Sequence, residues 1–371
     1  MRLLLLDQFS DPGGAQQCLL DLLPAIRQRG WQALVALPGE GELFKRVRAQ
    51  GFETARVDCG PYSSGRKSLS DVARFLAETP RLVRQIRKLT SDLQADLIYI
   101  NGPRLLPAAA LAHTRCPVVF HSHSYLPPGP VRKLAGTALR GMAARVIANC
   151  RFVAEPWRPY VRPENLAVIY NGVPGPASHL RQARQEPPRV GCIGRIAPEK
   201  GQREFLAAAS IILRAVPDCR FSVYGAPLFS EPRYAEEVRA AAAGLPVEFA
   251  GWVPDVYAAL AGLDLVLAPS AAHEATTRVI LEAFAAAVPV VAFRSGGIPE
   301  TIDDGHGGWL ADSVEEMARL AVAFLTAAPE VRAAVGQAAR DTWRRRFTLD
   351  RYQEAVIRQL EIELGKDRKI R

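Results

Sequence analysis

The sequence contains no hydrophobic run long enough to cross a membrane, which takes roughly 20 residues. Its amino-terminal apolar run is interrupted at Asp7, so it is too short for the core of a signal peptide. A chain without either feature is predicted to be cytoplasmic.

Paired cysteines are also missing. The six cysteines lie far apart, mostly inside apolar segments, and no CxxC pair occurs. Neither a disulfide framework nor a zinc site is therefore expected. The cysteines are interpreted as small core residues in a reducing compartment.

Two nucleotide-binding motifs are absent. The sequence has neither a GxGxxG fingerprint nor a GxxxxGK[ST] loop, which argues against NAD binding and P-loop chemistry. It also has no recognised nucleic-acid module and no aromatic residues interleaved with its basic ones, so no nucleic-acid partner is expected.

The residues that are present are typical of a globular α/β protein. Hydrophobic residues make up 49% of the chain and charged residues 23%, and a length of 371 residues favours two domains. Short aliphatic runs alternate with longer amphipathic segments, in one series before residue 180 and in a second after residue 189. This alternation predicts two doubly wound domains, each with a parallel sheet covered on both faces.

The predicted domain boundaries follow from breaks in this alternation. We expect an N-terminal domain over residues 1–180, a polar, proline-containing linker over 181–188, and a C-terminal domain over 189–347. Residues 348–371 are predicted to form a long charged helix that crosses back to the N-terminal domain.

The net charge of +9 is unevenly distributed. Residues 1–180 hold 23 Lys/Arg against 13 Asp/Glu, whereas residues 181–371 hold 24 against 25. The basic excess, concentrated in residues 74–88, has two interpretations. It is either a solvated helix face, or it attracts an anionic membrane surface or an anionic substrate.

Candidate ligand-binding residues follow the predicted strands, because open parallel sheets bind ligands beyond the carboxyl ends of their strands. Gly13 and Gly14 follow the first strand and open a helix, where backbone N–H groups can meet an anion. Arg195 and Lys200 follow the first strand of the second domain. Two cations in such a loop suit a diphosphate, although they could also be ordinary surface residues.

Two glutamates, Glu274 and Glu282, flank the start of another predicted helix, for which Thr276 or Thr277 is a suitable N-cap. On one continuous helix they would lie about 12 Å apart along the axis. The paired carboxylates of a glycosidase lie about 5–10 Å apart. The spacing therefore favours two separate contacts to an elongated ligand. Alternatively, a glutamate near the helix N-terminus could simply complement the helix dipole.

In their order along the chain, these segments resemble the retaining glycosyltransferases of family 4, which have the GT-B fold. The similar segments are GGAQQCLLDLLPAIRQRGW near the amino terminus, then IYNGV, GRIAPEKG and EATTRVILEAFAAAVPVVAFRSGGIPE. The resemblance implies two Rossmann-like domains that face a central cleft.

The resemblance also implies roles for the candidate residues in binding a sugar nucleotide. Arg195 and Lys200 would bind the diphosphate, Glu282 the ribose hydroxyls and Glu274 the hydroxyls of the donor sugar. The remaining implied contacts come mainly from backbone groups: Gly13, Gly14, Thr277 and Arg278 at the phosphates, and Val253 at the base.

The sequence differs from the family pattern at two points, and it offers two candidates for the active-site histidine. The family commonly has Gly-Phe-Gly where this chain has Ala275, Thr276 and Thr277, whose hydroxyls could donate to phosphate or sugar. No Asp-x-Asp motif occurs, so no metal is expected at the diphosphate. His121 matches the family's active-site histidine, with His123 as the alternative.

The implied activity is metal-independent transfer of a hexose from a nucleoside diphosphate sugar, UDP favoured over GDP, with retention of configuration. The acceptor would be a glycan, a lipid-linked sugar or a small molecule. Asn101 and Arg104 are predicted on the acceptor side, and a peripheral position at the inner face of the membrane is a further prediction. A sugar-nucleotide epimerase or phosphorylase and a non-catalytic sugar-nucleotide-binding subunit are the alternatives.

Overall fold

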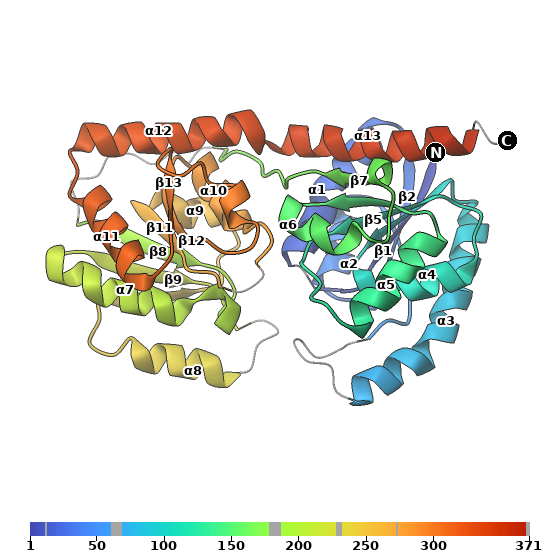
Figure 1. Ribbon diagram of the computed structural model, residues 1–371, viewed down its shortest axis with the longest axis horizontal. Coiled ribbons are helices and arrows are strands. Elements are labelled where there is room, and N and C mark those ends of the chain that lie inside the picture. Colours follow the sequence, from blue (N-terminus) through green and yellow to red (C-terminus); the bar gives the residue numbers. More distant parts are fainter. Residues whose placement is uncertain (12, 61–68, 178–186, 228–231, 272–273, 369–371) are drawn as a thin grey trace. The chain divides into compact units, whose positions relative to one another are not determined.

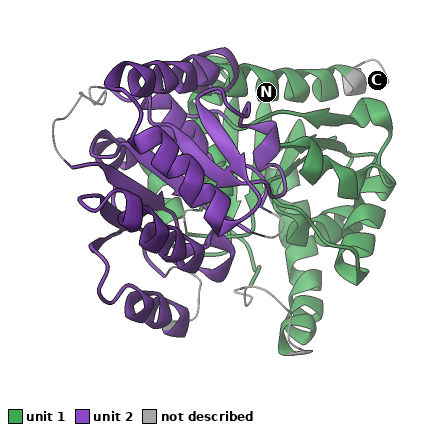
Figure 2. Cartoon of the chain, turned by 60° about the vertical axis from the view of Figure 1, so that its left-hand side comes forward, with its two compact units in different colours: residues 1–171, 349–371 green, residues 172–348 purple. Residues whose placement is uncertain are grey.

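The computed structural model describes residues 1–11, 13–60, 69–177, 187–227, 232–271 and 274–368 (Figure 1). The chain divides into two compact units (Figure 2). Unit 1 comprises Met1–Asn171 and Leu349–Arg371, and unit 2 comprises Gly172–Thr348. The predicted linker, 181–188, lies outside the described residues except for its last two positions.

The described part of unit 1 contains one parallel sheet of seven strands in the order β3-β2-β1-β4-β5-β6-β7. Its central strands are buried and mostly aliphatic, as expected for a parallel sheet covered on both faces. The strands are β1 (Arg2–Asp7), β2 (Gln32–Leu37), β3 (Glu53–Arg56), β4 (Leu97–Asn101), β5 (Val118–Ser122), β6 (Arg145–Ala148) and β7 (Leu166–Val168).

Helices cover both faces of this sheet (Figure 1). Alternate side chains of β1 point to opposite faces: Leu3 and Leu5 pack with one helical layer, and Leu4 and Leu6 with the other. The first layer is α1 (Gly14–Gln28), α2 (Glu42–Ala49) and α13 (Leu349–Arg368), and the second is α3 (Leu69–Leu93), α4 (Leu106–Ala112) and α5 (Pro130–Gly141). Shorter segments are α6 (Arg151–Ala154) and the 3-10 turns η1 (Pro103–Leu105), η2 (Glu155–Trp157) and η3 (Pro163–Asn165).

The described part of unit 2 repeats this plan with six parallel strands in the order β10-β9-β8-β11-β12-β13. They are β8 (Arg189–Ile193), β9 (Arg220–Tyr224), β10 (Val247–Gly251), β11 (Leu265–Ala268), β12 (Val290–Phe293) and β13 (Gly308–Ala311). One face packs on α7 (Gln202–Ala215), α8 (Pro232–Ala241) and α11 (Val314–Leu325), the other on α9 (Val256–Ala261), α10 (Arg278–Ala285) and α12 (Pro329–Arg346). The 3-10 turns η4 (Pro198–Lys200) and η5 (Ile298–Glu300) lie in connecting loops.

Both units are doubly wound α/β domains, which confirms the predicted fold class. In each sheet the strand order reverses direction once, between β1 and β4 in unit 1 and between β8 and β11 in unit 2. Ligands of doubly wound sheets bind at this switch point, beyond the carboxyl ends of the strands. Within the described residues, no helix is long and apolar enough to span a membrane.

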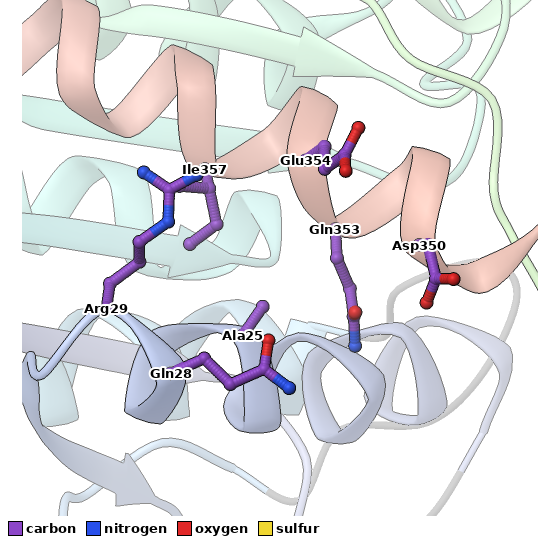
Figure 3. A pocket seen from close by; sticks show the side chains of 7 residues that line it. All are labelled: Ala25, Gln28, Arg29, Asp350, Gln353, Glu354 and Ile357. Atoms are coloured by element: carbon purple, nitrogen blue, oxygen red, sulfur yellow. The ribbon is translucent and has the colours of Figure 1, made fainter.

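A polar groove lies between α1 and α13 (Figure 3). Helix α1 starts at the carboxyl end of β1 and runs back along the sheet. The groove lies at the carboxyl-terminal end of α1, so it is remote from the switch point. The groove has a volume of about 200 Å³. Its lining comes from Ala25 and Gln28 of α1, from Arg29, the C-cap residue of α1, and from Asp350, Gln353, Glu354 and Ile357 of α13.

Candidate functional site

The switch point of unit 2 is bridged by an ion pair between two predicted site residues. Lys200, in the loop after β8, places its Nζ 2.6 Å from Oε2 of Glu274, in the loop after β11. The two side chains are only 19% and 15% exposed. Residues 74 positions apart thus form one charged centre where this fold binds ligands.

Close backbone packing holds the Lys200 loop in place. Gly201 has a φ of +71°, and a Cβ at this position would lie 2.0 Å from the carbonyl oxygen of Pro269. The loop also receives a hydrogen bond of 3.1 Å from the backbone N–H of Ala271 to the carbonyl oxygen of Glu199. Glycine is therefore required at Gly201, because any side chain would push the loops after β8 and β11 apart.

A second glycine pair positions Glu274. Gly297 donates its backbone N–H to the carbonyl oxygen of Glu274 at 2.9 Å. Gly296 has a φ of +54°, and a Cβ there would lie 1.9 Å from that same carbonyl oxygen. From the sequence this pair could be interpreted only as a turn. The structure shows that it supports the loop that carries Glu274.

We expect Gly296→Ala to lower kcat/KM by at least about tenfold, because an ångström of misplacement at a site can cost up to about a hundredfold. Steady-state kinetics with a fixed acceptor would measure the loss. Gly305→Ala is the matched control, since Gly305 has a φ of +83° with nothing within 4 Å of its Cβ position. Equal activity losses in the two variants would contradict the proposed support of Glu274.

The helix that starts after Glu274 carries the other predicted donor contacts. Thr277 is the N-cap residue of α10, but its side chain makes no capping hydrogen bond, and its buried Oγ1 has no partner among the described residues. The Thr276 side chain is also buried. Arg278 Nε lies 3.4 Å from Oε1 of Glu282, one turn farther along, and both side chains are mostly buried.

The remaining predicted residues of unit 2 lie in neighbouring loops. Arg195 pairs with Glu199 at 2.9 Å within the β8 loop. Val253 is half-buried in the connection from β10 to α9. Carboxylates therefore hold three cations at this edge: Lys200, Arg195 and Arg278.

The switch point of unit 1 is bridged by a hydrogen bond instead of an ion pair. Asn101, at the end of β4, donates its Nδ2 to Oδ2 of Asp7, at the end of β1, at 2.5 Å. Both side chains are buried. Asp7 also accepts hydrogen bonds from Gln16 Nε2 and the backbone N–H of Phe9, both 2.9 Å from its Oδ1. Asp7 and Gln16 were not predicted as site residues.

Burial raises the pKa of Asp7 from its ordinary value of 3.8 to about 6, and the hydrogen bonds from Asn101, Phe9 and Gln16 offset only part of this rise. The folded state therefore binds this proton more tightly than the unfolded state does. Ionising Asp7 costs stability, a loss of about 3 kcal/mol that develops as the pH rises from about 4 to about 6.

This pKa predicts a specific pH dependence of folding. Relative to Asp7→Asn, the wild-type free energy of unfolding should fall by about 3 kcal/mol between pH 4 and pH 7. Urea denaturation at several pH values would measure both proteins, and effects common to both cancel in the difference. A constant difference across this range would contradict the assignment.

The two candidate histidines occupy different environments. His121, in β5, is fully buried, and its Nδ1 lies 2.5 Å from the hydroxyl of Tyr99. Burial lowers its pKa well below the ordinary value, and the neighbouring His123 lowers it further. His123 is half-buried, and its Nε2 lies 2.7 Å from Oδ1 of Asn101. The His121 assignment stays a prediction, and the geometry favours the alternative, His123.

The other predicted residues of unit 1 lie at the same edge of the sheet. Gly13 is the N-cap of α1 and Gly14 is its first residue. Arg104 donates its backbone N–H to Gln8 Oε1 at 3.2 Å, and its guanidinium lies 5.1 Å from the ring centre of Phe9. Among the described residues, no group of three or more His, Cys, Asp or Glu side chains could hold a metal ion.

Comparison with known proteins identifies the class to which this fold and these residues belong. A family model described as "Glycosyltransferase Family 4" matches residues 12–174, and one described as "Glycosyl transferases group 1" matches residues 187–327. The chain belongs to this family of glycosyltransferases, as its sequence motifs predicted.

Particular relatives extend over most of the chain. A protein of Mycolicibacterium smegmatis named "GDP-mannose-dependent alpha-(1-6)-phosphatidylinositol monomannoside mannosyltransferase" is 34% identical over 76% of this chain and 81% of its own length. The phosphatidyl-myo-inositol mannosyltransferase of Mycobacterium leprae is 25% identical over 84% and 82%. HepE of Anabaena, solved in complex with UDP-glucose, has a TM-score of 0.82 and 26% identity over 97% of this chain and 99% of its own.

Proposed function

We propose that this glycosyltransferase moves a hexose from a nucleoside diphosphate sugar to a hydroxyl of its acceptor with retention of configuration. The observation that carries the proposal is the ion pair of Lys200 and Glu274 at the switch point of unit 2. An ammonium group suits the diphosphate, and a carboxylate suits the hydroxyls of the donor sugar. Arg195 and the N-terminus of α10 add positive potential from the flanking loops.

The proposed chemistry needs stabilisation of the leaving group more than a side-chain base. As the bond from the anomeric carbon to the phosphate oxygen breaks, negative charge grows on the diphosphate, where Lys200 and Arg195 stabilise it. The acceptor oxygen bonds to the anomeric carbon on the same face, and its proton passes to the departing phosphate. Configuration is thereby retained.

The donor is testable by thermal shift with a panel of sugar nucleotides. A ligand at 100 times its Kd should stabilise the protein by about 2.7 kcal/mol. We expect a UDP-hexose to give the largest shift, in line with the UDP-glucose present in the Anabaena HepE structure. A larger shift with GDP-mannose, the donor named for the Mycolicibacterium smegmatis relative, would overturn the base preference. No shift with any sugar nucleotide would contradict the proposed function.

For the acceptor, we propose a lipid-linked molecule at an anionic membrane surface. Exposed aliphatic side chains occur near the starts of both α3 and α5, namely Val72, Leu76, Val131 and Leu134, each 48–64% exposed. These helix starts follow strands β3 and β5, so they lie toward the edge of unit 1 that carries His123. Residues 101–150 contain six Lys/Arg and no Asp/Glu, a balance that favours anionic lipid.

Sedimentation with vesicles tests this surface. The wild-type chain should bind vesicles containing anionic lipid at low salt, and a Leu76→Gln/Leu134→Gln variant should bind about a hundredfold less or weaker still, because burying each leucine contributes about 1.5–3 kcal/mol. Val331→Gln, at a position 52% exposed in unit 2, is the matched control. Equal binding of neutral and anionic vesicles, or no effect of the double variant, would contradict the proposal.

A further inference from the structure

A mostly buried arginine connects the helix that carries Glu282 with the segment through which the chain enters unit 2. Arg278, the first residue of α10, places its Nε 3.4 Å from Oε1 of Glu282, and the two side chains are 12% and 16% exposed. Its Nη1 donates to the carbonyl oxygen of Gly172, the first residue of unit 2, at 3.5 Å. One guanidinium thus contacts a predicted donor-binding carboxylate and the junction between the two units.

The start of unit 2, the entry segment Gly172–Gly175, is also bonded to the carboxyl-terminal end of α12. Val173 donates its backbone N–H to the carbonyl oxygen of Phe347 at 3.0 Å. Its own carbonyl oxygen accepts a hydrogen bond of 3.1 Å from Trp343 Nε1. The last residue of the segment packs so closely on the Trp343 ring that a Cβ there would lie 2.8 Å from it. The entry segment therefore has defined partners in α10 and in α12.

Helix stability does not explain an arginine at position 278. A cation at the first position of a helix lies against the positive end of the helix dipole. In an i,i+4 ion pair, the order with glutamate before the cation is the more stabilising one, whereas here Arg278 precedes Glu282. The contact with Gly172 gives the arginine a partner outside its own helix.

The shape of the guanidinium makes this connection rigid. Its five N–H donors lie in one plane, so Nε and Nη1 keep a fixed spacing while they contact Glu282 and Gly172. A displacement of the Gly172 carbonyl is therefore passed on to the Glu282 carboxylate. A carboxylate has about four acceptor positions, so Glu282 can accept from Arg278 and from two ribose hydroxyls at once.

We propose that Arg278 is a positioning residue that holds the Glu282 carboxylate for the ribose of the donor and couples donor binding to the entry segment. The proposal rests on the proposed glycosyl transfer and on the ribose contact predicted for Glu282. Coupling between two sites is reciprocal. A bound donor therefore stabilises the hydrogen bonds of the entry segment, and a loosened entry segment binds the donor more weakly.

Hydrogen exchange at the Val173 amide tests this coupling, because this N–H is buried and bonded to Phe347. NMR would measure its exchange with and without saturating UDP-glucose, or GDP-mannose if that gives the larger thermal shift. We expect the nucleotide to slow exchange about fivefold in the wild type, the lower end of usual coupling, and not at all in Arg278→Met. Arg294→Met, at an arginine with exposed ion pairs in unit 2, should behave like the wild type.

Donor binding separates the two contacts of Arg278. Arg278→Met should raise the donor Kd about tenfold, the contribution of one hydrogen bond to a charged group. It should raise KM more than it lowers kcat, because the ribose takes no part in the bond that breaks. Arg278→Lys should recover part of the affinity, since its ammonium still pairs with Glu282. It should not recover the slowing at Val173, since a point charge cannot keep both contacts.

Trp343→Phe tests the coupling from the other side of the entry segment. This change removes the hydrogen bond to the Val173 carbonyl and should raise the donor Kd about fivefold. The effect should disappear in an Arg278→Lys background, because the connection is already broken there.

Three outcomes would overturn the positioning role: no slowing at Val173 in a wild-type chain that binds the nucleotide, equal slowing in the wild type and Arg278→Met, or an unchanged donor Kd in Trp343→Phe. If Arg278→Met does not fold, Arg278→Lys takes its place in the exchange comparison. A wild-type chain that binds no sugar nucleotide would contradict the proposed function, and the positioning role with it.

Discussion

Replacing Lys200 by methionine is expected to lower kcat/KM for glycosyl transfer by about 10³-fold, while the protein stays folded. Lys200 holds the positive charge at the switch point of unit 2, and removing one preorganised group that stabilises transition-state charge costs about 10²–10³-fold. Methionine keeps the length of the side-chain stem and removes only the charge. Most of the loss should appear in kcat, because the charge on the diphosphate grows as the donor bond breaks.

The ion pair with Glu274 adds a stability cost that can be separated from the activity loss. In Lys200→Met the Glu274 carboxylate, 15% exposed, loses its cation, which should cost about 2 kcal/mol. A Lys200→Met/Glu274→Gln double variant should recover most of this stability and none of the activity. Lys45→Met, in an exposed ion pair on α2, is the control for an ordinary lysine. Near-wild-type kcat/KM in Lys200→Met would refute the donor-site assignment.

Replacing Arg145 by methionine should lower the free energy of unfolding of unit 1 by about 3–5 kcal/mol, because it leaves a buried carboxylate without its cation. Arg145 of β6 contacts Glu363 of α13 at 2.9 Å, and both side chains are under 10% exposed. The same guanidinium donates to Gln359 Oε1 and to the carbonyl oxygen of Glu164. Urea denaturation followed by far-UV circular dichroism would measure the loss.

Helix α13 supplies its own control for this prediction. Glu361 pairs with Arg29, the C-cap residue of α1, but both side chains are over 40% exposed, so Glu361→Gln should change stability by at most about 1 kcal/mol. An Arg145→Met/Glu363→Leu double variant replaces the buried pair by apolar groups, which should restore much of the loss. Equal losses of unfolding free energy in Arg145→Met and Glu361→Gln would show that burial does not determine how much these ion pairs contribute to stability.

The sequence predicted the fold class because the central strands are continuous aliphatic runs, a strong local signal. Two strands of the structure were not predicted from the sequence. Residues 53–56 of β3, ETAR, are polar and only partly buried, and residues 308–311 of β13 form a four-residue strand after a glycine-rich segment. Both pair with a single neighbouring strand, so their strand conformation depends on sheet contacts more than on their own composition.

Site residues could be predicted from the sequence where the residue type alone indicates a chemical role. Lys200 and Glu274 could be singled out because charged residues after strands are informative. Their direct contact depends on loop packing at Gly201 and Gly296, which no local pattern encodes. Asp7 looked only like the end of an apolar run, since its partner Asn101 is 94 positions away. The choice between His121 and His123 required knowing which ring the helix α13 covers.

The composition of unit 1 from two separate stretches has a consequence for the order of events during synthesis. Unit 2 is one continuous segment, whereas the core of unit 1 includes Tyr352, Val356, Ile357, Leu360 and Leu364 of α13. Unit 1 therefore cannot complete its core until residues beyond 349 have left the ribosome, by which time the whole of unit 2 has already emerged. Unit 2 can therefore complete its core before unit 1 does, the reverse of the usual order in which the amino-terminal domain folds first. Until α13 arrives, the apolar surface that it covers on α1 and the sheet stays open to chaperones.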